Sequence, residues 1–142
     1  MELKNFGSVL NFAAEMEAND GAFYQCAAKN PACQSHKDLF EGLSQEHRQN
    51  EQRILRVRRE NVTEMILEPI RDFTKAPFVL EYTGADRMGL KEVVEAARKL
   101  ETRSENYYLE AAEKLKALPE VTGELKRIGK KHVIHKEKLP SL

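Results

Sequence analysis

Apolar residues recur at alternating three- and four-residue steps in four segments of the chain, the period of a helix with one face in a core. The pattern predicts a first helix over about 5–29 and a second over about 35–61, with Ser35 as its N-cap. A third helix is predicted over about 89–117. The fourth begins near Pro119 or Thr122 and ends before Pro140. The chain is therefore expected to be all-α, a single four-helix bundle domain over 1–142.

The connection between the second and third predicted helices is unusually long. It runs from about 63 to 88 and contains Pro69, Pro77 and Gly84. Its length excludes a tight turn and suits a crossover from one helical hairpin to the next.

The two halves of the chain repeat one another. At an offset of 84 residues, Ala13, Glu17 and Tyr24 align with Ala97, Glu101 and Tyr108. At an offset of 85, the aligned pairs are Leu43 with Ile128, His47 with His132, Asn50 with His135 and Ile54 with Leu139. Matched Glu, Tyr and His residues on matched stripes favour two related hairpins over a chance alignment.

Polar side chains interrupt each apolar stripe near its middle. Residues three apart lie on one helix face, and paired hairpins bring all four helices to the same level. The sequence therefore predicts a buried cluster made of Glu17, His47, Asn50, Glu101, His132 and His135.

The charge of this cluster must be compensated, because a buried carboxylate is protonated, paired with a positive charge or bound to a metal. One divalent ion would neutralise Glu17 and Glu101, and imidazole with carboxylate ligands suits zinc, ferrous iron or manganese. The alternative without a metal pairs each glutamate with a protonated histidine. We favour metal binding, with Asn50 as a weaker ligand or as a hydrogen-bond partner of a ligand.

Composition narrows the possible partners. Lys and Arg balance Asp and Glu at 23 each, and this zero net charge argues against nucleic-acid binding. No apolar run approaches the roughly 20 residues of a membrane span, and the first residues lack the apolar core of a signal peptide. We expect a cytoplasmic protein without a membrane partner. Two cysteines, Cys26 and Cys33, are too few for a disulfide framework or a cysteine-based zinc site.

Two segments resemble the rubrerythrin branch of the ferritin-like superfamily. In residues 15–24 a glutamate, Glu17, precedes a Phe-Tyr pair by six residues, and residues 100–112 place Glu101 before Tyr107 and Tyr108 in the same way. The resemblance covers nearly the whole chain. It implies a ferritin-like bundle of two pseudo-repeated hairpins, and an iron-dependent oxidoreductase that acts on peroxide or oxygen.

Members of that family hold two iron atoms between single glutamates on helices one and three and E-x-x-H pairs on helices two and four. By this resemblance Glu17 and Glu101 match the single glutamates, and His135 matches the histidine of helix four. The other motif positions differ, because the two E-x-x-H glutamates are replaced by His47 and His132, and the helix-two histidine by Asn50.

Loss of these two carboxylates removes negative charge that a di-iron centre needs, so one ion, iron or zinc, is favoured over a full di-iron centre. A second register keeps Glu46 as the helix-two carboxylate in place of His47. The offset of 85 and the apolar neighbours Leu43 and Ile54 favour His47 and Asn50.

Two functions follow from these patterns. The first is a rubrerythrin-like metalloprotein, redox active with peroxide or oxygen, which would need a separate electron-donor protein because the chain has no cysteine-ligated rubredoxin-like module. The second is a structural or interaction protein that keeps the bundle and has lost di-iron chemistry. A homodimer is also expected, since the crossover carries apolar runs at 65–67 and 78–80.

Overall fold

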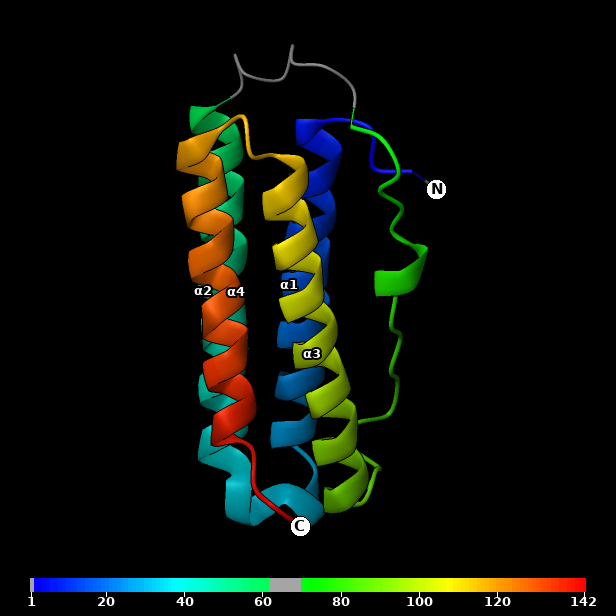
Figure 1. The fold of residues 1–142 in the computed structure, drawn as a ribbon. Helices are drawn as coiled ribbons and strands as arrows, with labels where there is room; N and C mark the ends of the chain where they lie inside the picture. The colour runs from blue at the N-terminus through cyan, green and yellow to red at the C-terminus, as the bar shows by residue number, and fades with distance from the viewer. Residues whose placement is uncertain (1, 62–69) are drawn as a thin grey trace.

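The computed structural model describes residues 2–61 and 70–142, and this part of the chain contains four long helices and no β-strand (Figure 1). They are α1 (Phe6–Ala28), α2 (Lys37–Glu60), α3 (Leu90–Lys114) and α4 (Pro119–Lys138), with short 3₁₀ helices η1 (Pro31–His36) and η3 (Ala76–Phe78). In Figure 1, α1 and α4 run in one direction and α2 and α3 in the other. The predicted all-α helical bundle is confirmed.

Local signals explain the starts of two of the long helices, α1 and α4. The side chain of Asn5 accepts a hydrogen bond from the Ser8 amide at 2.8 Å and caps α1. Pro119 occupies the first turn of α4, where its missing N–H costs nothing.

The predicted start of the second helix at Ser35 is wrong. Residues 31–36 form η1 instead, because the Asn30 side chain accepts from the Ala32 amide at 2.9 Å and Pro31 starts the 3₁₀ turn. Consequently α2 follows directly at Lys37, without a side-chain cap.

Residues 70–89 run along one edge of the bundle, beside α1 and α3 (Figure 1). Near the start of this segment the Ile70 amide donates to the Lys4 carbonyl at 2.8 Å. Near its end the Asn30 side chain donates to the Ala85 carbonyl at 2.8 Å. Lys4 and Asn30 flank α1, so the segment spans the whole length of that helix.

Of the two apolar runs expected to bind a second subunit, 65–67 lies outside the described residues. In the second run, 78–80, Phe78 is buried. The centroid of its ring lies 6.0 Å from that of Phe73 and 5.1 Å from that of Tyr107. Only Val79 of this run is more than a third exposed, at 45%. The run at 78–80 therefore contributes apolar surface to the core of the same chain. The homodimer stays a prediction.

The core has two apolar clusters at opposite ends of the bundle. One contains Leu10, Ile54 and Leu125, and the other contains Leu43 and Val94. Between them lies the polar layer formed by the middle of all four helices. The helices thus bury the polar groups by placing apolar packing above and below them.

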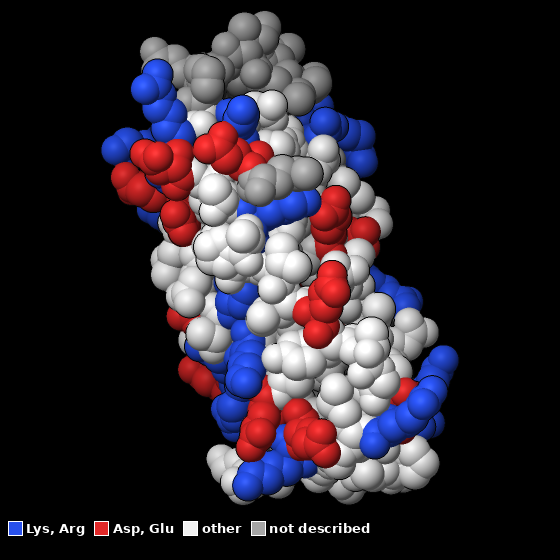
Figure 2. All heavy atoms as spheres, turned by 90° about the vertical axis from the view of Figure 1, so that its right-hand side faces the viewer, with Lys and Arg blue, Asp and Glu red and all other residues white. Residues whose placement is uncertain are grey.

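The surface carries mixed charge. Figure 2 shows Lys and Arg interspersed with Asp and Glu on the face that residues 70–89 cover, so neither sign dominates this side. None of the described helices has the length and apolar character needed to span a bilayer.

Candidate metal centre

All six side chains of the predicted cluster are buried, each with no more than 1% of its surface exposed. Each of the four long helices contributes at least one of them. Glu46, the alternative helix-two carboxylate, lies at the edge of the bundle, and its side chain is 38% exposed. The structure therefore places His47 and Asn50, not Glu46, in the interior.

Small residues let the paired helices approach closely enough for the side chains of the cluster to contact one another. Ser44 donates its hydroxyl to the Gly21 carbonyl at 2.8 Å, and a Cβ on Gly21 would lie 3.4 Å from the Ser44 carbonyl. On the other hairpin, a Cβ on Gly129 would lie 3.2 Å from the Cβ of Tyr108. Both helix pairs are therefore in contact next to the polar layer.

Two histidines each bridge the two glutamates. His47 places Nδ1 2.8 Å from Glu17 Oε1 and Nε2 2.9 Å from Glu101 Oε2. His132 places Nδ1 2.6 Å from Glu101 Oε1 and Nε2 2.8 Å from Glu17 Oε2. An ionised carboxylate only accepts hydrogen bonds, so both nitrogens of each ring carry a proton. Two imidazolium charges then balance two carboxylate charges.

Further donors complete the shell around each carboxylate. Tyr108 donates to Glu17 Oε2 and Tyr24 to Glu101 Oε2, both at 2.6 Å. Asn50 Nδ2 donates to Glu17 Oε1 at 3.3 Å, and the counterpart bond joins His135 Nδ1 to Glu101 Oε1 at 3.1 Å. Each glutamate therefore accepts four hydrogen bonds, and each bond of Glu17 has a counterpart at Glu101.

The pKa values follow from this arrangement. Burial opposes ionisation of Glu17, but the charges of His132 and His47 outweigh it and hold the pKa of Glu17 well below its usual range. Burial likewise opposes ionisation of Glu101, and His47 and the histidine hydrogen bonds keep its pKa well below normal.

The opposite shift occurs at the histidines. Burial lowers the pKa of His132, but the Glu17 charge and the hydrogen bonds that His132 donates to both carboxylates raise it to about 9. The same balance raises the pKa of His47 well above its ordinary value. At neutral pH without a metal, His47 and His132 are therefore protonated and Glu17 and Glu101 are ionised, so the charges of these four groups cancel.

Four members of the cluster have the chemistry and spacing to hold a metal ion. His47, Glu101, His132 and His135 each offer a ligand atom, and these atoms lie within 4.8 Å of one another. In addition, His135 Nε2 is buried and has no hydrogen-bond partner among the described residues. Three imidazoles and a carboxylate form a donor set that fits zinc or ferrous iron.

A bound ion would require the cluster to rearrange. Two ligand atoms on one tetrahedral ion are about 3.3 Å apart, whereas the imidazole–carboxylate contacts measure 2.6–3.1 Å. These are hydrogen-bond distances. To bind a metal, the ligand rings must therefore lose protons and separate by several tenths of an ångström from the carboxylates.

Next to the cluster lies a buried ion pair that the sequence did not reveal. Arg103 Nη2 is 2.6 Å from Asp20 Oδ1, and Ser104 donates to Asp20 Oδ2 at 3.4 Å. Burial raises the pKa of Asp20 to about 6, although the Arg103 charge opposes this shift. The sequence did contain a signal for the burial of Asp20, because it lies three residues after Glu17 and therefore on the same inward face of α1.

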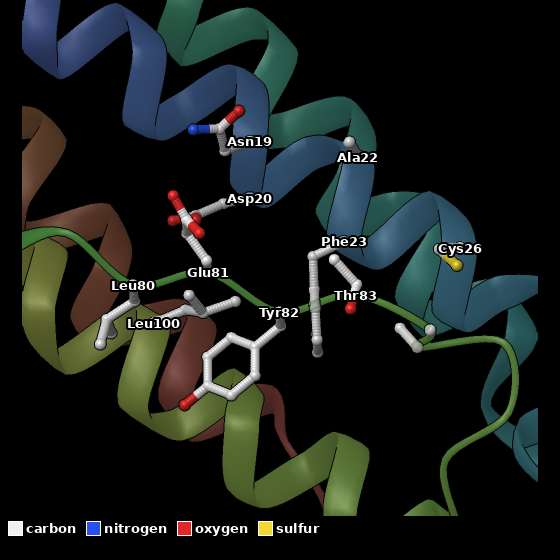
Figure 3. Close-up of a pocket in the computed structure, with 12 residues that line it drawn as sticks. Asn19, Asp20, Ala22, Phe23, Cys26, Leu80, Glu81, Tyr82, Thr83 and Leu100 are labelled. Atoms are coloured by element: carbon white, nitrogen blue, oxygen red, sulfur yellow. The ribbon is translucent and has the colours of Figure 1, made fainter.

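A pocket of about 540 Å³ opens beside Asp20, which is one of its lining residues (Figure 3). It lies between α1, α3 and residues 80–85; Asn19, Asp20 and Glu81 gather at one end, and Phe23 and Tyr82 form its apolar walls. None of the six cluster side chains lines it. The pocket is thus a neighbour of the cluster and does not open onto it.

The chain was compared with protein-family models, curated proteins and solved structures. No family model matches it, and no curated protein or solved structure shows significant similarity. Its function is therefore argued from the geometry and chemistry of the cluster.

Proposed function

We propose that this protein is a rubrerythrin-like member of the ferritin-like superfamily that binds one divalent transition metal ion in its bundle core. The ligands are His47, Glu101, His132 and His135. The supporting observation is that these four buried side chains bring ligand atoms within 4.8 Å of one another. The matched hydrogen bonds of Glu17 and Glu101 support two pseudo-repeated hairpins, and the path of residues 70–89 along the bundle supports a crossover between them.

Charge balance makes such binding feasible without changing the rest of the core. Without metal, two imidazolium rings neutralise two carboxylates. With metal, one divalent ion supplies the same two positive charges while the rings become neutral. Binding therefore exchanges about two protons for one ion, and it weakens in acid because ligands must be deprotonated.

Glu17 and Asn50 act on the ligands in this proposal. Glu17 accepts from His47 Nδ1, which leaves the other ring nitrogen facing Glu101. Such a carboxylate fixes the orientation of a ligating histidine and raises its basicity. Asn50 in turn donates to Glu17, so both residues position ligands without binding the ion.

Reaction with peroxide or oxygen is the activity that the rubrerythrin resemblance suggests for an iron-loaded form. Such an ion supplies redox chemistry when bound, and electrons would come from a separate donor protein. The chain itself contributes the buried ligands and the hydroxyl groups of Tyr24 and Tyr108, which hold the glutamates in place. Peroxide turnover of the iron-loaded protein with a chemical electron donor tests this activity.

A second candidate is a structural or interaction protein, homodimeric or bound to another partner, whose polar core needs no metal. One observation favours this candidate. Both carboxylates accept hydrogen bonds from groups of the chain itself, and the charges of His47 and His132 cancel those of Glu17 and Glu101. In that case the cluster fixes the register of the four helices.

Metal content separates the two candidates. We expect close to one equivalent of a transition metal in protein purified without a histidine tag. His135→Gln should weaken Co²⁺ affinity at least about tenfold, since ligand-shell changes have effects of that order or larger. His36→Gln is the matched control, because it makes the same chemical change at a partly exposed histidine outside the cluster, and it should retain the ion. Less than about 0.2 equivalents, with no thermal stabilisation by added Zn²⁺ or Co²⁺, would refute metal binding.

A further inference from the structure

Glu46 is a partly exposed carboxylate that reaches a member of the buried cluster. It lies on α2, and its Oε2 is 3.6 Å from Nε2 of His135. The Glu46 side chain is 38% exposed, whereas that of His135 is 1% exposed. This pair thus joins the solvent to the interior across the contact between α2 and α4.

The 3.6 Å separation of Glu46 Oε2 and His135 Nε2 is longer than every hydrogen bond described within the cluster, the longest of which is 3.3 Å. His135 Nδ1 donates to Glu101, so Nε2 is the ring nitrogen left without a hydrogen-bond partner. A distance of 3.6 Å is too long for a hydrogen bond. It is closer to the separation of about 3.3 Å between two ligand atoms on one tetrahedral ion.

The Glu46 carboxylate also forms an ion pair with a lysine. Lys138 Nζ lies 3.3 Å from Glu46 Oε2, and its side chain is 45% exposed. Exposed pairs of this kind contribute little to stability. A divalent cation can therefore displace Lys138 from Glu46 at little cost.

The large pocket is a less suitable route for a cation. Its only buried carboxylate, Asp20, is already neutralised by Arg103 at 2.6 Å. The positive charge of Arg103 beside Asp20 would repel a cation at that end of the pocket, and none of the four proposed ligands lines the pocket. The edge at Glu46 leads directly to an imidazole nitrogen.

We propose that Glu46 and His135 Nε2 form a loading site, at which a divalent cation from solvent binds before it moves to the buried ligands. This inference rests on the metal-binding function proposed above. His135 belongs to both sites, because its Nε2 faces Glu46 and its Nδ1 faces Glu101, so the ion passes from one side of this ring to the other. Lys138 slows loading because it competes for the same carboxylate.

Stopped-flow absorbance with Co²⁺ tests the loading site in the 142-residue chain. We expect Glu46→Gln to lower the association rate about tenfold, a typical size for local electrostatic attraction. Lys138→Ala should raise that rate, and neither variant should change the amount of Co²⁺ bound at saturation. The matched control is Glu124→Gln, which removes another partly buried carboxylate between α2 and α4, paired with Arg53.

The outcomes distinguish this inference from the proposed function. An unchanged rate in Glu46→Gln, or an equal fall in Glu124→Gln, overturns the loading site while metal binding stands. If the wild-type protein binds no Co²⁺, metal binding and the loading site are both refuted. Urea unfolding of Glu46→Gln should match the wild type, which excludes a folding defect as the cause of slow loading.

Discussion

Replacing Glu17 by Gln removes one of the two charges that keep His47 and His132 protonated. The amide has nearly the same shape, and its oxygen still accepts from one ring. Its NH₂ group, however, faces an N–H of the other ring, because Glu17 contacts both rings at 2.8 Å. One ring must then give up its proton, and the buried ion pair is broken.

The expected loss is about 3–5 kcal/mol in the free energy of unfolding, the range for removing one partner of a buried pair. The pKa of His132 gives a consistent figure. A rise from the ordinary histidine pKa of 6.5 to about 9 corresponds to stabilisation on the order of 3 kcal/mol.

This contribution depends on pH with a definite sign. A histidine whose pKa is raised by folding stabilises the protein fully below its unfolded value, about 6.5, and no longer does so above about 9. The lowered pKa values of Glu17 and Glu101 stabilise it above about 4.5, and this stabilisation is lost as the pH falls. The metal-free wild type should therefore be most stable between about pH 4.5 and 6.5.

Urea unfolding followed by circular dichroism, in EDTA at pH 6 and pH 9, measures both effects. The wild type should lose stability between these two pH values, and Glu17→Gln should lose less because one ring is already neutral. Glu15→Gln makes the same chemical change at an exposed position of α1 and should stay within about 0.5 kcal/mol of the wild type. A loss below about 1 kcal/mol for Glu17→Gln, or an unchanged pH dependence, would refute the ionic cluster.

Three further outcomes are expected. Tyr108→Phe removes the 2.6 Å hydrogen bond to Glu17 and should lower the free energy of unfolding in urea by about 2 kcal/mol. Tyr24→Phe removes the equivalent bond to Glu101 and should cause a similar loss. No loss in either variant would show that the hydroxyls are dispensable. Asp20→Asn leaves the Arg103 charge buried without a partner, and the same assay should show a loss of about 3 kcal/mol; wild-type stability would contradict this role of the pair. Adding Co²⁺ at pH 7 to weakly buffered protein should release about two protons per ion, measured by pH-stat titration, and release of none would contradict the exchange of protons for metal.

The amino-acid sequence by itself determined the helices and the composition of their inner faces. A side chain's direction depends on its position along a helix, so apolar spacing alone predicted four helices with Glu17, His47 and their counterparts turned inward. The repeat between the halves also predicted which groups would meet at one level. The start of α2 was misplaced because Asn30 and Pro31 favour a 3₁₀ turn before Lys37.

Only the tertiary structure decided which atoms contact each other. Distances between helices depend on packing from distant parts of the chain, as at Gly129 against Tyr108, and spacing within one helix carries no information about them. The balanced charges of the cluster, the burial of Arg103 against Asp20 and the 3.6 Å gap between Glu46 and His135 all depend on such distances. The residue types of the site were therefore predictable, whereas their protonation and their order from solvent to core required the folded bundle.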